Sequence, residues 1–403
     1  MIPVEEAQAR IRRALAPLPV EWVHVDRAHG RVLAAALSAE RDQPAADVSA
    51  MDGYAVRAAE AVAGAVLAVA GEAAAGTAAG GELAAGTARR IFTGGLVPAG
   101  ADTILIQENA ERDGARVRVR EATAPDRHIR RRGQDFTAGS VMLEAGRRLT
   151  ARDVGLAVAL GHGHVPVHRR PRVGVAGTGN ELVRPGVTAG PAQVPNSNVT
   201  ALMAAVTAFG GTALDLGIVE DRADALADLA ARAHGLDLLV TTGGASVGDH
   251  DLVKSALGGA GLALDFWKIA MRPGKPLLFG RLGDVPVLGL PGNPVSALVC
   301  TLLFVRVALE RLGGTPSCEL ATSEAELAVP LGPNGERRDF LRTRLDAGGR
   351  GGRPRALPAS RQDSAMLATL AQADGLINRD PHAAAQPAGS LVRVVRFHDF
   401  AGF

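Results

Sequence analysis

The chain has 403 residues, more than one ordinary hydrophobic core holds, so we expect about two to four domains. Hydrophobic residues make up 47% of the sequence and charged residues 21%, which is the balance of a soluble globular protein. Lysine and arginine together number 44 against 42 acidic residues, leaving a net charge of +2. No long-range field is therefore expected to attract nucleic acid or an anionic membrane surface.

The cysteines and the N-terminus indicate a reducing compartment. Cys300 and Cys318 are the only two cysteines, and their spacing favours neither a disulfide framework nor a zinc site. The N-terminal segment carries Glu5 and Glu6 and lacks an apolar signal core. The longest apolar stretch, 61–70, is about half the length needed to span a bilayer. We expect a cytoplasmic protein that binds neither nucleic acid nor membranes.

The first third of the chain predicts one helix followed by a β-rich region. Residues 3–18 carry apolar positions at helical spacing, and Pro17 and Pro19 close the segment. These positions are Val4, Ala7, Ile11 and Leu15. From about 21 to 150, short strand-like runs such as 104–107 and 116–120 alternate with Gly, Pro and Asp turns.

From about residue 170 the pattern changes to strands that alternate with helices. Strands are predicted over 172–176, 213–219, 236–240, 263–269, 277–280 and 285–290. Helices are predicted over 198–209 and 221–234 and from Pro294 to Leu312, with Asn293 as the N-cap. This alternation predicts a parallel sheet covered on both faces. Beyond about 316, short strands and turns predict a small β domain.

Three loops at the carboxyl ends of predicted strands indicate a ligand site. They span 177–181, 243–251 and 291–296, and each combines glycine with polar or acidic side chains. Loops at this edge of a parallel sheet line the ligand crevice, and two of these open into helices, whose free N–H groups favour an anion. A single loop of this kind is usually only a turn. Neither a G-x-G-x-x-G fingerprint nor a Walker loop is present, which argues against a dinucleotide or ordinary NTP site.

Two further polar clusters and the lysines are notable. Residues 49–55 contain the single tyrosine, and 131–135 follow a basic run at 127–132 that no aromatic residue interleaves. The simplest interpretation is a turn at Asp52-Gly53 and a solvated strand at 127–132. A nucleic-acid patch at 127–132 is disfavoured because no aromatic residue is available for stacking. Lysine occurs only at Lys254, Lys268 and Lys275. In an arginine-rich chain, a retained lysine suggests a position that a guanidinium does not fit, although chance clustering explains the pattern equally well for the first two.

Taken in order, these segments resemble the molybdopterin molybdenumtransferases, the MoeA family that includes the E domain of gephyrin. The matching motifs span nearly the whole chain. They are Ser-Ala-Met-Asp-Gly-Tyr-Ala at 49–55, Phe-Thr-Gly-Gly at 92–95, Pro-Ala-Gly-Ala-Asp at 98–102, Arg-Arg-Gly-Gln-Asp at 131–135, Thr-Gly-Asn-Glu-Leu at 178–182, Thr-Gly-Gly-Ala-Ser-Val-Gly at 242–248 with Asp251, Arg-Pro-Gly-Lys-Pro at 272–276, Pro-Gly-Asn-Pro-Val-Ser at 291–296, Gln362-Asp363-Ser364 and Ala373-Asp374-Gly375. One departure is Asn180, where the family usually has Asp. Glu181 is kept, so weaker metal binding is expected rather than loss of the reaction.

The resemblance implies an α/β plus β architecture: a central parallel α/β domain flanked by β-rich domains, with a small C-terminal β-barrel. The implied boundaries are 1–20 with 133–168 for a linker domain, 21–132 for a β-rich domain, 169–315 for the α/β domain and 316–403 for the barrel. It further implies a homodimer whose site lies between the α/β domain of one subunit and residues 49–135 of the other.

The implied reaction is insertion of molybdate into molybdopterin-adenylate with release of AMP, assisted by Mg²⁺. The implied catalytic and metal-binding residues are Asp52, Asp135, Glu181 and Asp251, because Mg²⁺ takes carboxylates and water. Those implied for the pterin substrate are Thr93, Thr178, Gly243, Gly244, Ser246 and Asn293. Those implied for molybdate are Lys275, Pro276, Ser296, Arg342 and Ser364. An ammonium suits one oxygen of an oxoanion, and a guanidinium can bind two. Without the resemblance, the simplest interpretation of Arg342 is an arginine on a β-strand at the rim of a domain.

Two other functions stay open. A scaffold that binds cofactor without turnover would be expected to lose the acidic set, and all four carboxylates are present. The second alternative is a related enzyme of the same fold that handles tungstate or adenylylates the pterin. Adenylylating relatives resemble only the α/β domain, whereas this chain also has the flanking β domains.

Overall fold

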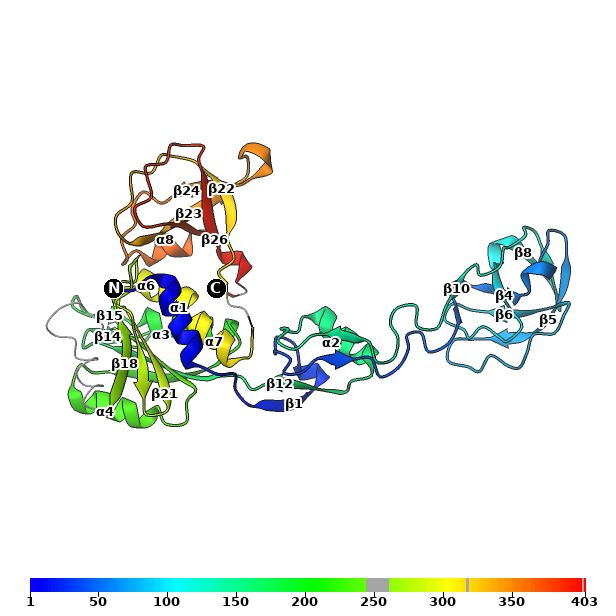
Figure 1. The fold of residues 1–403 in the computed structure, drawn as a ribbon, viewed down its shortest axis with the longest axis horizontal. Coiled ribbons are helices and arrows are strands. Elements are labelled where there is room, and N and C mark those ends of the chain that lie inside the picture. The colour runs from blue at the N-terminus through cyan, green and yellow to red at the C-terminus, as the bar shows by residue number, and fades with distance from the viewer. Residues whose placement is uncertain (244–260, 317–318, 401) are drawn as a thin grey trace.

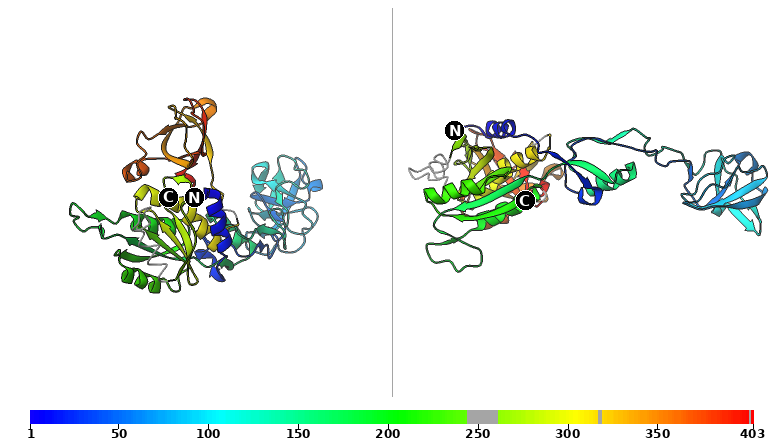
Figure 2. Two further views of the ribbon diagram at one scale, coloured as in Figure 1. Left: turned by 60° about the vertical axis from the view of Figure 1, so that its left-hand side comes forward. Right: turned by 90° about the horizontal axis from the view of Figure 1, so that it is seen from below.

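The computed structural model describes residues 1–243, 261–316, 319–400 and 402–403. The molecule is elongated, with two bodies stacked at one end, a small body in the middle and a β-rich body at the far end (Figure 1). Both termini lie at the stacked end, so the chain runs out to the far body and returns (Figures 1 and 2). The predicted multi-domain α/β plus β class is confirmed.

The α/β domain is built on a six-stranded sheet with the order β16-β13-β17-β21-β20-β18. Its strands are β13 (Arg172–Thr178), β16 (Thr212–Val219), β17 (Leu238–Thr242), β18 (Leu262–Trp267), β20 (Leu278–Leu282) and β21 (Val285–Leu290). Its helices are α3 (Ser197–Ala208), α4 (Ala223–Arg232), and α6 (Pro294–Cys300) continued through a π-helical turn, Thr301–Val305, into α7 (Arg306–Leu312). The four strands from β16 to β21 are parallel, as predicted.

The other two strands depart from the prediction of a wholly parallel sheet. β20 pairs antiparallel with β21, and β18 pairs antiparallel with β20. Only Gly283 and Asp284 separate β20 from β21, and Gly283 has a φ of +57°. A link this short can form only a hairpin, because a parallel connection needs roughly a dozen residues or more.

Both faces of the sheet are covered. Along β17, Leu238 and Val240 face one buried cluster and Leu239 faces the other. The parallel strands are therefore almost continuously apolar, as expected where helices pack on both sides.

The N-terminal helix α1 (Val4–Ala14) packs into this domain. Its predicted apolar positions are each at most 5% exposed and share a cluster with residues of α3 and α7. Gln8 Nε2 also donates to the Leu303 carbonyl at 2.9 Å, which ties α1 to the π-helical turn. This differs from grouping residues 1–20 with the linker domain, because an amphipathic helix settles where its apolar face is buried rather than beside its sequence neighbours.

The linker domain and the far β domain follow each other along the molecule. The linker domain contains β1 (Val20–His24), β2 (Leu37–Ser38), β11 (Val141–Leu143), β12 (His164–His168) and α2 (Ala151–Leu160). Residues 20–38 therefore pack with the linker domain rather than with the β-rich domain to which the implied boundary at 21 assigned them. The far domain contains β4 (Gly53–Val56), β5 (Val66–Ala73), β6 (Thr87–Ile91), β7 (Thr103–Ile106), β8 (Ala110–Asp113) and β9 (Arg116–Val119), in the order β7-β4-β6-β5-β9-β8. Beside that sheet, β3 (Val48–Ser49) pairs with β10 (Ile129–Arg130).

The C-terminal domain is a closed five-stranded barrel, as expected. Its strands are β22 (Ser323–Leu327), β23 (Arg338–Asp346), β24 (Arg355–Pro358), β25 (Gly375–Arg379) and β26 (Leu391–Arg396), with the short helix α8 (Leu367–Ala371). Closure follows because β23 pairs with both β24 and β25. The short strand β19 (Met271–Arg272) pairs with the start of β23 and so links the barrel to the α/β domain. Within the described ranges, no helix is long and apolar enough to cross a membrane.

Helix α2 begins with a capping box that depends on a buried carboxylate. Asp153 is 4% exposed, accepts from Thr150 N at 2.8 Å and pairs with Arg147 Nη2 at 2.8 Å. Burial alone would raise the pKa of Asp153, but the hydrogen bonds from Arg147 and Thr150 outweigh it and lower the pKa to about 2. Because the unfolded value lies near ~3.9, the charged form stabilises the fold by ~2 kcal/mol at neutral pH. This contribution is complete above about pH 4 and is lost as the pH falls through 2.

We therefore predict that Asp153→Asn weakens the linker domain by ~2 kcal/mol at pH 7 and by much less near pH 2. Hydrogen exchange of the α2 amides at the two pH values measures the difference. Asp26→Asn is the control, since the Asp26 side chain in the same domain is 81% exposed. Equal destabilisation by Asp153→Asn at both pH values would show that the residue acts through packing rather than charge.

Candidate functional site

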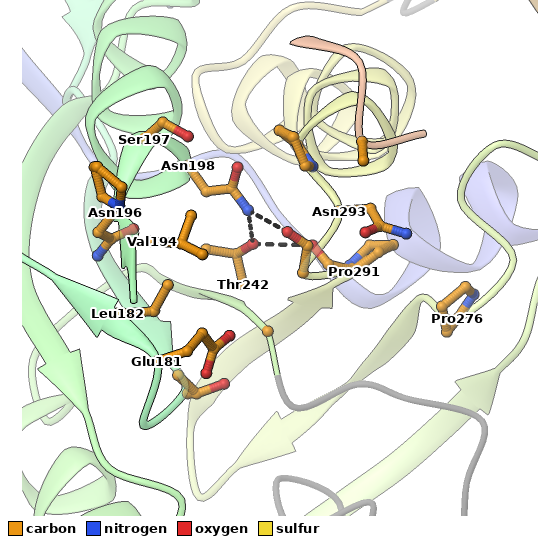
Figure 3. Close-up of a pocket in the computed structure, with 16 residues that line it drawn as sticks. Glu181, Leu182, Val194, Asn196, Ser197, Asn198, Thr242, Pro276, Pro291 and Asn293 are labelled. Carbon is orange, nitrogen blue, oxygen red and sulfur yellow. Dashed lines mark hydrogen bonds between the residues drawn. The ribbon is translucent and has the colours of Figure 1, made fainter. Parts of the chain in front are cut away.

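A pocket of about 650 Å³ opens at the carboxyl edge of the parallel strands. The loops after β13, β17 and β21 and the first turn of α3 form its walls (Figure 3). It is lined by Thr178, Glu181, Leu182, Val194, Pro195, Asn196, Ser197, Asn198, Thr242, Gly243, Pro276, Pro291, Gly292, Asn293, Pro294 and Ala365. The described parts of all three glycine-rich loops thus meet in one cavity.

Gly243 closes the end of β17 against the end of β13. Its φ is +99°, and a Cβ at this position would lie 2.1 Å from the Thr178 carbonyl oxygen, so a side chain is excluded. Thr178 itself is 2% exposed, and its hydroxyl has no hydrogen-bond partner within the described part of the chain. A buried hydroxyl without a partner at a pocket wall is available to a ligand.

Asn198, in the first turn of α3, ties two of the loops together. Its Nδ2 donates to Thr242 Oγ1 at 3.0 Å and to the Gly292 carbonyl at 2.8 Å. Thr242 Oγ1 in turn donates to the Pro291 carbonyl at 2.9 Å, as the dashed lines in Figure 3 mark. Asn198 was not among the predicted site residues. The available signal was an Asn-Ser-Asn run before an apolar helix, and its first residue, Asn196, caps α3 by accepting from Val199 N at 3.3 Å.

Two carboxylates approach each other beside this pocket. Glu181 lines it, and a Cβ on Gly179 would lie 2.4 Å from the Glu181 carboxylate. Asp221 follows β16, and its pKa is raised by burial and by the charge of Glu181. Its Oδ1 is buried and has no hydrogen-bond partner among the described residues. Asp221 was missed because a single Asp before a predicted helix looks like a cap.

The unusual Asn180 has a structural use. Its Oδ1 accepts from the Asp221 backbone N–H at 3.2 Å, a contact that an Asp carboxylate would make equally well. The described residues contain no group of three His, Cys, Asp or Glu arranged to hold a metal. Three predicted site residues, Gly244, Ser246 and Asp251, lie outside the described residues.

The segment carrying Lys275 and Pro276 lies against α6. Pro276 lines the pocket and Lys275 is half-buried. Gly274 has a φ of +110°, and a Cβ there would lie 2.6 Å from Cys300 Sγ. This glycine therefore allows the segment to approach the helix closely and keeps Lys275 next to the pocket.

The barrel contributes Ser364 to the same region. Asn293 Nδ2 donates to Ser364 Oγ at 2.9 Å, and Val295 N donates to the Ser364 carbonyl at 3.1 Å. Asn293 occupies the N-cap position of α6 as predicted, but its side chain makes no capping hydrogen bond. Ser296 lies in the first turn of α6 and is 5% exposed.

Arg342, which the resemblance implies as a molybdate ligand, is buried in the barrel. It lies on β23 and is 1% exposed. Its guanidinium donates to Gln362 and to backbone carbonyls of the segment 361–366. It does not line the pocket.

Asp52, Thr93 and Asp135 are not brought to the pocket within one chain. Asp52 precedes β4 and Thr93 follows β6, and both strands lie at the far end of the molecule (Figure 1). Asp135 follows β10 on the exposed return segment toward the linker domain.

Asp52 and Thr93 do contact each other. Asp52 Oδ1 accepts from Thr93 N and Oγ1, each at 2.8 Å, and these hydrogen bonds lower the pKa of Asp52. Their neighbour Arg90 was not among the predicted site residues. Its guanidinium lies over the rings of Tyr54 at 5.2 Å and Phe92 at 4.8 Å. In the far domain, the ionised carboxylate of Asp52 is therefore fixed by Thr93 and lies near the guanidinium of Arg90.

Comparison with known proteins covers nearly the whole chain. Residues 2–161 match the model of the MoeA N-terminal region, domains I and II; residues 174–311 match a probable molybdopterin binding domain; residues 324–397 match the MoeA C-terminal region, domain IV. A solved molybdopterin biosynthesis MoeA protein from Pyrococcus horikoshii superposes with a TM-score of 0.83 at 26% identity, covering 98% of this chain and 100% of that one.

Curated relatives agree with the family models. Molybdopterin molybdenumtransferase 2 of Mycobacterium tuberculosis is 37% identical over 350 residues, covering 84% of this chain and 85% of the relative. The molybdopterin molybdenumtransferase of Haemophilus influenzae is 35% identical over 319 residues, covering 78% of each. With the same domain order, the same fold and this identity, the chain belongs to the molybdopterin molybdenumtransferase family.

Proposed function

We propose that this chain inserts molybdate into adenylylated molybdopterin and releases AMP. The observation that carries the proposal is the pocket at the sheet edge, which Thr178, Glu181 and Asn293 help to line. Asn293 also contacts Ser364 of the barrel. The family's curated members are named molybdopterin molybdenumtransferases, and the chain has every domain of that family.

The pocket suits an anionic ligand with a flat ring. The first turn of α3 lies in its wall, and free backbone N–H groups at a helix start attract phosphate. Gly243 and Gly292 present bare backbone, which a ring or pyrophosphate can approach closely. The hydroxyl of Thr178, which has no hydrogen-bond partner in the described part of the chain, adds one donor. We assign the molybdopterin-adenylate to this cavity.

Glu181 and Asp221 fit a divalent cation such as Mg²⁺. Two carboxylates close enough for one to raise the pKa of the other are stabilised by a cation between or beside them. The buried Oδ1 of Asp221, which has no hydrogen-bond partner among the described residues, supplies an oxygen ligand of the kind Mg²⁺ prefers. Bound there, the metal would neutralise charge on the pyrophosphate bridge.

We assign molybdate to the side of the pocket near Asn293, between the segment that carries Lys275 and Pro276 and the first turn of α6. Lys275 supplies a compact positive charge for one oxygen of the dianion. Ser364 and Ser296 supply hydroxyl donors, with the backbone at Pro276 beside them. The dianion is thereby held at the opposite side of the pocket from Glu181 (Figure 3 labels Pro276 and Glu181).

Two chains are needed to bring the acidic residues together. Asp52 and Thr93 lie on the far domain, and Glu181 lies in the pocket at the other end of the same molecule. We propose a homodimer in which the far domain of one subunit covers the pocket of its partner.

A complementation experiment tests this split site. Asp52→Asn and Glu181→Gln should each keep the fold and lose most cofactor formation, since both residues lie on loops. Co-refolding the two variants in equal amounts should restore roughly a quarter of wild-type activity, because half of the dimers are mixed and each mixed dimer has one intact site. The readout is molybdenum cofactor formation, measured by reconstituting an apo-molybdoenzyme.

Light scattering supplies the companion measurement, with an expected mass twice the 41.4 kDa of one chain. Dimers that regain no activity after mixing would place Asp52 and Glu181 in the same site of one chain or outside the site. A fully active monomer would also overturn the split site.

The cation assignment predicts an effect of Asp221. Asp221→Asn should raise the Mg²⁺ concentration for half-maximal rate on the order of tenfold, because removal of a ligand or of its support at a metal site typically has this effect. Asp215→Asn is a matched control, since Asp215 is an exposed carboxylate on the neighbouring strand β16. An unchanged Mg²⁺ requirement in Asp221→Asn would remove this residue from the metal site.

The lysine assignment predicts that shape matters as well as charge. Lys275→Arg should be nearly as damaging as Lys275→Ala, because the planar guanidinium is larger and carries its donors at fixed angles. Lys268→Arg should be tolerated, since Lys268 Nζ lies over the Trp267 ring at 3.7 Å and arginine makes the same kind of contact. Wild-type rates for Lys275→Arg would mean that charge alone suffices.

A further inference from the structure

The backbone at Asp52 in the far domain is held by two side chains of neighbouring strands. Arg90 lies on β6, and Gln107 follows β7 directly. Arg90 Nη1 donates to the Gly53 carbonyl at 3.1 Å, and Arg90 Nη2 donates to Gln107 Oε1 at 3.0 Å. The backbone N–H of Gln107 donates to the Asp52 carbonyl at 3.1 Å. These three hydrogen bonds, which we call the Asp52 anchor, form a closed set of contacts around the Asp52–Gly53 backbone.

Two aromatic rings restrict where the guanidinium of Arg90 can lie. Its Cζ is 5.2 Å from the centroid of the Tyr54 ring and 4.8 Å from that of the Phe92 ring, and both distances suit a cation–π contact. Tyr54 is 4% exposed and stands opposite Arg90 in the antiparallel pairing of β4 and β6. The arginine is therefore fixed by the two strands that adjoin Asp52 and Thr93.

The carboxylate of Asp52 is held separately from its backbone. Its Oδ1 accepts from Thr93 N and Thr93 Oγ1, each at 2.8 Å. These two hydrogen bonds orient the side chain, but they do not fix the backbone from which it projects. The Asp52 anchor does so, because a planar guanidinium reaches Gly53 and Gln107 at the same time. A functional side chain keeps one geometry only when the groups that support it are also locked.

We propose that Arg90 is a positioning residue for the reaction, one that fixes the Asp52–Gly53 backbone so that the Asp52 carboxylate is presented in one place, and that it does not itself contact the substrate. The part that Asp52 plays in the reaction rests on the proposed function. The anchor depends only on the contacts of Arg90 and Gln107.

The deciding variant is Arg90→Lys, because it keeps a positive charge beside the two rings and loses the fork that joins Gly53 to Gln107. The rate at saturating pterin-adenylate and molybdate should fall about tenfold, with both half-saturating concentrations within about twofold of wild type. If Arg90 instead bound an anionic group of the substrate, the half-saturating pterin-adenylate concentration would rise about tenfold or more. That rise, or an unchanged rate, would overturn the proposal.

Gln107→Ala tests the same anchor without a change of charge. The Gln107 side chain is exposed, so its removal should leave the fold intact. The saturating rate should fall about threefold, because one hydrogen bond of Arg90 is lost while the bond to Gly53 remains. A wild-type rate for Gln107→Ala would show that the contact between Arg90 and Gln107 is not part of the anchor.

A double variant tests whether Arg90 acts through Asp52. In the Asp52→Asn background, adding Arg90→Lys should change the residual rate by less than about threefold, because the group that Arg90 positions is already lost. A further tenfold fall in the double variant would mean that the two residues contribute independently, and it would count against the positioning role.

Arg89→Lys is the matched control. Arg89 is the neighbour of Arg90 on β6, is 9% exposed and also donates to backbone carbonyls, those of Ala70 at 3.3 Å and Gly81 at 3.0 Å. Because adjacent residues of a strand point to opposite faces, this variant should lower the stability of the far domain without lowering the rate per folded molecule. A tenfold fall in Arg89→Lys as well would reduce the effect to general loosening of the domain and overturn the proposal.

Hydrogen exchange provides a readout that does not depend on catalysis. Gln107 N and Thr93 N, which donate to the carbonyl and to Oδ1 of Asp52, should exchange faster in Arg90→Lys and at the wild-type rate in Arg89→Lys. Val119 N, which donates to the Ala65 carbonyl in the same domain, is the reference and should not change in Arg90→Lys. Faster exchange at the two amides in a protein that forms no cofactor even as wild type would support the anchor and refute the proposed function. Unchanged exchange at both would refute the anchor whatever the activity.

Discussion

The hydrogen bonds of Asn198 are the constraint on which the pocket depends. One side-chain amide holds the loop after β17 through Thr242 and the loop after β21 through Gly292. Parallel pairing brings these loops to the same edge of the sheet, but it does not set the space between them. Because the amide comes from the first turn of α3, the same bonds fix the helix start against both loops. A cavity with bare backbone and free N–H groups is the result.

On the acidic side of this cavity, burial and a like charge disfavour the ionised form of a carboxyl group. Burial and the neighbouring Glu181 raise the pKa of Asp221, which is unfavourable for the apo fold and favourable for a cation. The far domain shows the reverse situation, since hydrogen bonds from Thr93 lower the pKa of Asp52. The ionised form of Asp221 is therefore disfavoured, whereas that of Asp52 is stabilised.

Division of the site among separate bodies explains why loops rather than strands carry most of its contacts. The α/β domain supplies the cavity, the barrel supplies Ser364 across its contact with Asn293, and the far domain carries Asp52 on a long extension (Figure 1). The far domain and the barrel each have a buried cluster of their own, whereas the core of the α/β domain continues into the barrel through Phe340 and Val395. Loop positions must then be fixed by side chains, as Arg90 and Gln107 fix the backbone at Asp52.

The sequence by itself determined the elements and the class of the fold. Periodicity and turn residues are local, so they located α1, the alternating strands and helices after residue 170 and the loop residues Thr178, Glu181 and Gly243. Tertiary structure alone decided which core α1 joins and that β20 and β18 run antiparallel. It also decided that the charge of Glu181 acts on Asp221 and that the guanidinium of Arg342 donates to the carbonyls of a loop. These features depend on partners far away in sequence, because the role of a charged side chain is set by which of its donors and acceptors remain free after packing.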